Sequence, residues 1–82
     1  MVTVHREAGF RFVIFKDDHE PAHVHVYYGG AEVKIALGIE GGSPENIRNY
    51  GMRMSDVRKA LKMVSAQQRM LLEKWNEIHG RK

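Results

Sequence analysis

The hydrophobic residues of this 82-residue chain follow two different periods. In the first half they alternate with polar residues, which is typical of strands, and in the last third they recur every three or four positions, which is typical of a helix. The alternation predicts strands over residues 2–5, 10–16, 22–28 and 31–37. We therefore expect an α+β fold: a small antiparallel meander of three to four strands, with one long C-terminal helix packed on one face.

The pair Gly29-Gly30 separates two alternating runs and predicts a two-residue β-hairpin, because the turns that suit such loops need positive φ. This loop length fixes the register of the two strands. The valines at 24 and 26 then meet Val33 and Ile35 on one side, which we call the valine face. The opposite side, which we call the histidine face, carries the polar members of the same strands: His23, His25, Tyr27, Glu32 and Lys34.

A helix is expected over residues 55–79, with Ser55 as its N-cap and Gly80 as its stop. Its apolar residues form one seam, interrupted only by Gln68. Such a helix is roughly 37 Å long, whereas a seven-residue strand spans about 23 Å. The second half would overhang the sheet, and its residues would contact a cognate small protein or a second copy in a homodimer: Leu71, Trp75 and Ile78.

The alternative is that the opening strand and the long loop fold back under this half of the helix. That loop is expected over residues 38–54, with a short strand near its end, because it contains two glycine-rich turns and a Ser-Pro pair.

Composition narrows the class of protein. Residues 1–82 are enough for one small domain. The chain has no cysteine, which excludes disulfides and zinc sites built from thiolates. No apolar run approaches the roughly 20 residues of a membrane span, and Arg6 and Glu7 stand where a signal peptide needs an apolar core. We expect a soluble cytoplasmic protein with no membrane contact.

The net charge of +3 is unevenly distributed, with six basic residues and one acid between Arg48 and Arg69. On the expected helix, Arg58, Lys62 and Arg69 fall within about 40° of one another, away from the apolar seam. Such a stripe suits the phosphate backbone of RNA or DNA. The alternative is a solvated helix face.

The segment DDHEPAHVHV, residues 17–26, contains three of the five histidines. His19, His23 and His25 are ligand types for a divalent metal such as zinc, and two histidines at i and i+2 on a strand point the same way. This pattern favours a histidine-cluster metal-binding module.

The same residues also fit chemistry without a metal. His23, His25 and Lys34, with Glu32 as a substitute base, match the base, acid and cation that cleavage of RNA requires. This hypothesis is a metal-independent ribonuclease. A third alternative is that the histidines only decorate a polar sheet face, so whether the chain is an enzyme stays open.

The histidine run resembles a bacterial family known as domain of unknown function 4160. The likeness rests on an Asp-His-x-Pro-x-His-x-His-Val pattern and a tryptophan near the C-terminus, here Asp18, His19, Pro21, His23, His25, Val26 and Trp75. Ala22 departs from it, since the family often has a second proline there.

That family has no established activity. Its members are commonly labelled, from their gene context, as toxin–antitoxin components or transcriptional regulators. The resemblance therefore implies a toxin–antitoxin-type small protein that binds a cognate protein and touches nucleic acid.

Overall fold

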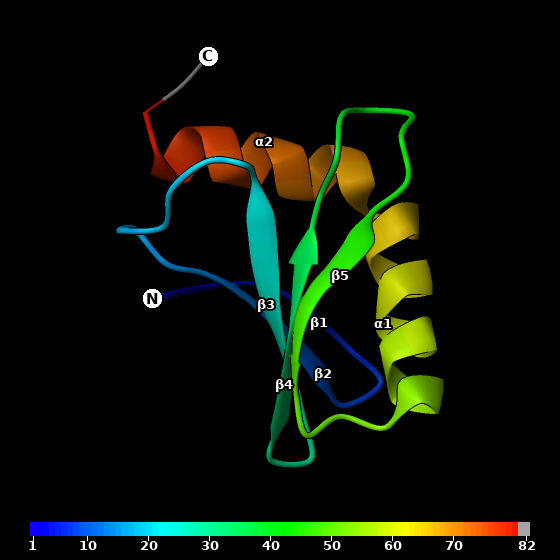
Figure 1. Ribbon diagram of the computed structural model, residues 1–82. Coiled ribbons are helices and arrows are strands. Elements are labelled where there is room, and N and C mark those ends of the chain that lie inside the picture. Colours follow the sequence, from blue (N-terminus) through cyan, green and yellow to red (C-terminus); the bar gives the residue numbers. More distant parts are fainter. Residues whose placement is uncertain (81–82) are drawn as a thin grey trace.

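The fold is α+β, with a five-stranded antiparallel meander and two C-terminal helices (Figure 1). The computed structural model describes residues 1–80, so residues 81 and 82 of the expected domain lie outside the described residues. The strands lie in the order of the chain: β1 (Val2–Glu7), β2 (Phe10–Ile14), β3 (His23–Tyr28), β4 (Ala31–Ala36) and β5 (Glu45–Tyr50). The helices are α1 (Met54–Ala66) and α2 (Gln68–Ile78). The fold class and the meander are confirmed, whereas three to four strands and a single helix were wrong.

The β3–β4 hairpin has the predicted register at every pair from His23–Ala36 to Tyr28–Ala31. Gly29 and Gly30 both have positive φ, 55° and 81°, as a two-residue primed turn requires. The valine and histidine faces of this hairpin are therefore those expected from the sequence.

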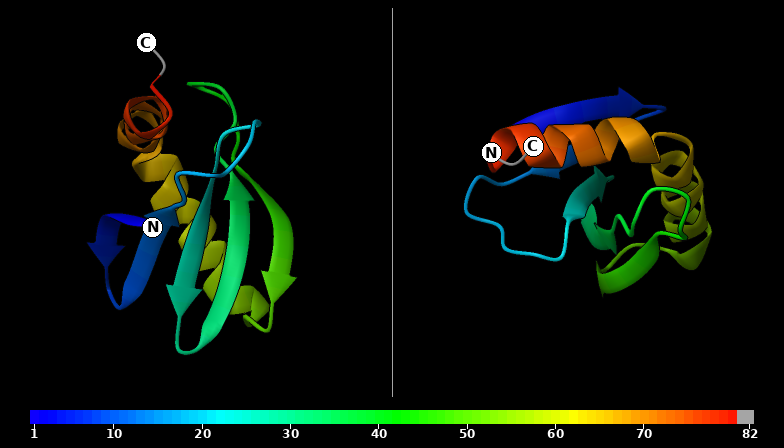
Figure 2. Two further views of the ribbon diagram at one scale, coloured as in Figure 1. Left: turned by 90° about the vertical axis from the view of Figure 1, so that its left-hand side faces the viewer. Right: turned by 90° about the horizontal axis from the view of Figure 1, so that it is seen from above.

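The valine face forms the core of the domain. Val24, Val26, Val33 and Ile35 are fully buried and cluster with residues of β2 and both helices. Helix α1 covers the valine face; in the left view of Figure 2 it lies behind the sheet. Burial of such side chains is the main stabilising contribution, about 1.5–3 kcal/mol for each large aliphatic side chain.

Strand β5 occupies a region in which the sequence predicted mostly loop. All six of its residues are exposed, and the strand forms an edge of the sheet. The sequence ENIRNY carries no apolar alternation because β5 has no buried face, so the signal used for the other strands was absent. A bulge opposite Lys34 and Ile35 leaves Ile47 without a cross-strand partner.

The expected single helix over residues 55–79 was wrong, because the chain bends at Gln67. At this bend the amide of Gln68 is buried against the loop that joins β4 to β5. Its Nε2 donates to the carbonyl oxygens of Leu37, Ile39 and Gly42, and its Oε1 accepts from the N–H of Gly41. The polar interruption of the seam is thus the contact that ties this loop to the helices.

After the bend, α2 crosses the end of the sheet instead of extending beyond it (Figures 1 and 2). The overhang predicted for the second half of the helix was therefore wrong. The cap was also misplaced, because Arg53 is the N-cap and Ser55 lies inside the first turn. Gly80 does follow the end of α2 with a φ of 68°, as predicted for the stop. Within residues 1–80, neither helix is long and apolar enough to cross a membrane.

Candidate metal centre

Two histidines of β3 point to the histidine face, away from the aliphatic core. Strand pairing places Val13, His25, Lys34 and Arg48 in one row across β2, β3, β4 and β5. His23 lies two residues before His25 and on the same face. This confirms the sorting of imidazoles and valines to opposite sides.

Both imidazoles are nevertheless buried, His23 with 7% and His25 with 8% of the residue exposed. Phe15, just after β2, meets the His25 ring edge-on at 4.7 Å between centroids. Trp75 of α2 lies 5.2 Å from the His23 ring. The polar face is thus covered at these two histidines by aromatic side chains.

Asp18 completes a compact cluster with the two histidines. Its Oδ2 lies 3.3 Å from Nε2 of His23 and 3.2 Å from Nε2 of His25. The same oxygen accepts the backbone N–H of Phe15 at 3.1 Å, and the N–H of Asp18 donates to the carbonyl of Phe15. This tight turn after β2 fixes the carboxylate over β3.

The other ring nitrogen of each histidine faces a second oxygen. Nδ1 of His23 lies 3.0 Å from the carbonyl oxygen of Pro21, and Nδ1 of His25 lies 2.8 Å from Oε2 of Glu32. Such contacts fix the orientation of an imidazole and leave its Nε2 directed at a common point. Here that point is Oδ2 of Asp18.

The potential ligand atoms of Asp18, His23 and His25 all lie within 4.8 Å of one another. Two of the three predicted metal ligands, His23 and His25, are thus brought together. His19, the third predicted ligand, does not join this group: its side chain is exposed, and the turn between β2 and β3 directs Asp18 inward instead.

A pocket of about 360 Å³ adjoins the cluster and is lined by Asp18, His19, His23, Lys34 and Ile47, among others. Of the residues predicted for acid–base chemistry, His23 and Lys34 line this pocket. Glu32 contacts His25. The bulge in β5 brings Ile47 to the rim of the same pocket.

The row beside the cluster contains Arg11, Tyr27, Glu32 and Tyr50. Burial raises the pKa of Tyr27 above its ordinary value of 10.0, and the charge of Glu32 raises it further, while Arg11 opposes the shift. Tyr27 is therefore a neutral phenol at physiological pH.

The basic stripe expected on one helix is divided by the bend at Gln67. Arg58 and Lys62 are exposed on α1, whereas Arg69 lies on α2 and its Nε donates to Glu40 at 2.9 Å. The continuous three-residue stripe was therefore wrong, because it assumed an unbroken helix.

The residues predicted to contact a partner do not form an exposed surface. Leu71 is fully buried, Trp75 is 2% exposed, and Ile78 is half-buried against the same core. Because α2 crosses the end of the sheet, these side chains pack inside the domain. The exposed overhang on which the assignment rested does not exist.

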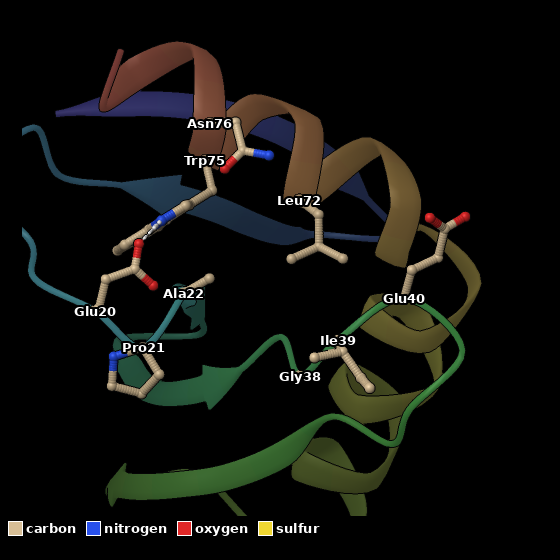
Figure 3. A pocket seen from close by; sticks show the side chains of 9 residues that line it. All are labelled: Glu20, Pro21, Ala22, Gly38, Ile39, Glu40, Leu72, Trp75 and Asn76. Atoms are coloured by element: carbon tan, nitrogen blue, oxygen red, sulfur yellow. Dashed lines mark hydrogen bonds between the residues drawn. The ribbon is translucent and has the colours of Figure 1, made fainter. Parts of the chain in front are cut away.

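Trp75 also connects α2 to the turn that carries Asp18. Its indole N–H donates to Oε2 of Glu20 at 3.2 Å, as Figure 3 shows. Glu20 and Pro21 form one wall of a wider pocket of about 780 Å³, with Leu72 and Trp75 of α2 on another side. The segment at 20–21 lines both this wider pocket and the one beside the cluster of Asp18, His23 and His25.

Asp18 and Gln68 are the site and scaffold residues that the sequence reasoning missed. Asp18 entered the sequence analysis only as the first residue of the family pattern, and its place at the start of the histidine run was the available signal. Gln68 had been noted as a break in the seam, and a polar residue at a predicted core position is itself a signal for a buried hydrogen-bond network.

A family model described as a domain of unknown function, DUF4160, matches residues 9–76. No curated protein and no solved structure matches the chain significantly. The matched range covers most of the chain and contains every residue of the cluster together with Glu32 and Trp75. The chain therefore belongs to the DUF4160 family.

Proposed function

We propose that this protein binds one divalent transition-metal ion, such as zinc, through Asp18, His23 and His25. Imidazole nitrogens and a carboxylate oxygen are ligand types that such ions take in proteins. The cluster offers three ligands at one point, with a pocket beside it.

The observation that carries this proposal is the buried Nε2 of His23, which faces Asp18 without a hydrogen bond. A carbonyl oxygen only accepts hydrogen bonds, so the contact of Pro21 with His23 places the proton of a neutral ring on Nδ1. Nε2 of His23 is then an acceptor that faces the acceptor oxygen of Asp18 at 3.3 Å. This buried nitrogen has no hydrogen-bond partner within the described part of the chain.

His25 lies between two carboxylates, with Nδ1 at 2.8 Å from Oε2 of Glu32 and Nε2 at 3.2 Å from Oδ2 of Asp18. With its proton on Nδ1, as at His23, its Nε2 lone pair also faces Asp18. Two imidazole lone pairs and a carboxylate oxygen in a buried space then repel one another, and a metal ion among them satisfies all three at once.

The spacing also favours a metal. Charge-assisted hydrogen bonds between an imidazolium and a carboxylate are about 2.7–2.9 Å long. Ligands that surround zinc tetrahedrally at about 2.0–2.1 Å lie roughly 3.3 Å from one another. The two separations at Asp18, 3.2 and 3.3 Å, match the second value, and the two Nε2 atoms lie within 4.8 Å of each other.

Three protein ligands are typical of catalytic metal sites, which keep a position open for substrate. When bound, a divalent ion supplies a Lewis acid that polarises a substrate oxygen. The chain's own contribution is to hold the ligands rigidly, to bury the cluster beneath Phe15 and Trp75, and to present Lys34 from the pocket wall.

A metal-independent ribonuclease is the second candidate. His23 and Lys34 line one pocket, and His25 lies between the carboxylates of Asp18 and Glu32. In this candidate His25 is oriented by its contacts with both carboxylates, and His23, which lines the pocket, is the group placed to exchange a proton with substrate. Activity that survives complete removal of metal would favour this candidate.

The test is metal stoichiometry in untagged protein, because a histidine tag would itself bind the ion. We expect about one equivalent of zinc per chain by elemental analysis after dialysis, and saturable binding of zinc by calorimetry. Asp18→Asn, His23→Ala and His25→Ala should each abolish stoichiometric binding. His19→Ala is the matched control and should bind normally.

Circular dichroism establishes that each variant remains folded, and Asp18→Asn preserves the shape of the side chain. Folded wild-type protein that takes up no metal overturns the proposal. Loss of binding in His19→Ala equal to that in His23→Ala overturns the exclusion of His19 from the ligand set, and full binding by Asp18→Asn overturns the assignment of Asp18.

The toxin–antitoxin role implied by the family stays a prediction. Metal-assisted cleavage of RNA would be one chemical route by which such a protein inhibits growth. A cognate partner would have to bind elsewhere than Leu71 and Trp75, since both lie in the core.

A further inference from the structure

We infer that the histidine face binds a single-stranded nucleic acid across β3, β4 and β5, and so presents a phosphodiester to the metal cluster. The part of this inference that names nucleic acid as the substrate of the metal cluster rests on the proposed function. The contact surface itself consists of residues that are not metal ligands, principally Lys34, Arg48 and Tyr50.

The cations of this face are placed next to the cluster by the strand register. His25 pairs with Lys34, and Lys34 pairs with Arg48. Neighbouring strands lie about 4.8 Å apart, so Arg48 is roughly 10 Å from His25 along one row. A single-stranded nucleic acid that follows this row passes from Arg48 over Lys34 to the cluster of Asp18, His23 and His25.

Lys34 and Arg48 are like charges directly opposite each other, an arrangement that destabilises a sheet. Neither has a carboxylate within ion-pair distance in the described part of the chain, whereas Arg69 on α2 pairs with Glu40. An anion bound over both side chains relieves their repulsion. The phosphate of a nucleic-acid backbone is such an anion.

Two tyrosines stand in the adjacent row, one on β3 and one on β5. Tyr27 and Tyr50 flank Glu32 on the two neighbouring strands. The guanidinium carbon of Arg11 lies 5.7 Å from the Tyr27 ring centroid, and that of Arg48 lies 5.5 Å from the Tyr50 ring centroid. Tyr50 is 47% exposed. Rows of basic and aromatic side chains on an open sheet are what single strands bind, because unpaired bases stack on the rings while phosphates meet the cations.

The β5 part of the histidine face is exposed at Arg48 and Tyr50. Helix α1 lies on the other side of the sheet, and α2 crosses its end (Figure 2). A duplex offers no unstacked bases to Tyr27 and Tyr50, so the surface favours a single strand. The charge on α1, at Arg58 and Lys62, lies on the opposite side and takes no part.

The experiment measures fluorescence anisotropy of labelled oligonucleotides, about 12 nucleotides long to match common single-strand site sizes. Single-stranded RNA, single-stranded DNA and a duplex are compared at low and high salt. We expect single strands to bind more tightly than the duplex. The double variant Lys34→Gln/Arg48→Gln should weaken binding at least tenfold and reduce its salt dependence.

Arg58→Gln/Lys62→Gln is the matched control, with the same change of charge on α1, and should bind like wild type. Tyr50→Ala should weaken single-strand binding while leaving heparin binding unchanged. Equal loss in the α1 variant, tighter binding of duplex, or full retention in Lys34→Gln/Arg48→Gln overturns the inference. The inference is also overturned if heparin displaces the oligonucleotide and Tyr50→Ala does not weaken oligonucleotide binding, because the surface then binds any polyanion.

The same assay on Asp18→Asn separates the two proposals. If the metal site is wrong but the face binds strands, Asp18→Asn and chelated wild type bind as untreated wild type does. If the metal site is right but the face is not, metal stoichiometry persists while Lys34→Gln/Arg48→Gln changes nothing. Comparison of the RNA and DNA arms identifies which strand the protein prefers.

Discussion

Nδ1 of His25 lies 2.8 Å from Oε2 of Glu32, across the β3–β4 hairpin and diagonal to the direct pair of His25 with Lys34. This contact joins a buried ring to a half-buried carboxylate on the neighbouring strand. It fixes the rotation of the imidazole. In the proposed metal site Glu32 would therefore act through His25 without being a ligand.

The first prediction concerns that contact. Glu32→Ala should lower metal affinity roughly 10–100-fold, the usual effect of removing an outer-shell partner of a metal-bound histidine. Glu32→Gln should lose less, because its amide oxygen still accepts the Nδ1 proton. A zinc dissociation constant from chelator competition measures both.

Glu45→Ala is the control, since Glu45 is an exposed acid on β5. Equal affinities for Glu32→Ala and Glu45→Ala would show that His25 does not depend on Glu32. Retention of the circular dichroism spectrum distinguishes loss of orientation from loss of fold.

The candidate site was partly predictable from the sequence, and the reason is local. His23, His25, Glu32 and Lys34 were assigned to one face because a two-residue turn at Gly29-Gly30 determines every pair of the hairpin. Asp18 was not assigned because it lies in an aperiodic turn. Its direction depends on hydrogen bonds to Phe15 that no period encodes.

The second prediction concerns Gln68. If the amide were only an interruption of an apolar seam, Gln68→Leu would stabilise the protein. We expect the opposite: a loss of about 2–3 kcal/mol in the free energy of unfolding, because the carbonyls and the N–H of the β4–β5 loop lose their partner. Urea unfolding measures it.

Gln67→Leu is the matched control, because it makes the same substitution one residue earlier in the chain. Gln67 makes no side-chain hydrogen bond within residues 1–80 that would be lost. Stabilisation by Gln68→Leu would contradict the role given to the buried amide.

The fold was predicted best where an element has one buried face. The seam of α1 and α2 keeps its spacing through the bend, since Val64 and Leu71 both reach the core from different helices. Periodicity alone therefore did not reveal that the helix ends at Ala66. Strand β5 was missed for the reverse reason, because an exposed edge strand has no apolar alternation to detect.

The third prediction concerns the hairpin turn. Gly29 has a φ of 55°, and a Cβ added there would meet nothing within 4 Å. Gly29→Ala should therefore cost about 1–2 kcal/mol through backbone strain alone. Gly29→Asn should cost less, because asparagine tolerates left-handed backbone. Thermal unfolding compares the two, and an equal loss would assign the effect to something other than φ.

The last prediction separates a core role from a partner role for α2. Leu71 is fully buried, whereas its neighbour Leu72 is half-buried and lines the wider pocket. Leu71→Ala should lower the free energy of unfolding by about 2–5 kcal/mol, as deletion of a buried leucine does. Leu72→Ala should lower it clearly less, because less of its surface is removed from water.

Sedimentation velocity on the same two variants reads the oligomeric state. Because Leu71 packs inside the domain, its replacement should change stability without changing the mass of the species in solution. If Leu71→Ala leaves stability unchanged but converts a wild-type dimer to a monomer, Leu71 contacts a partner. That result would overturn the packing described for α2. Leu72→Ala, which alters an exposed wall of the pocket, shows whether any change of mass belongs to that pocket instead.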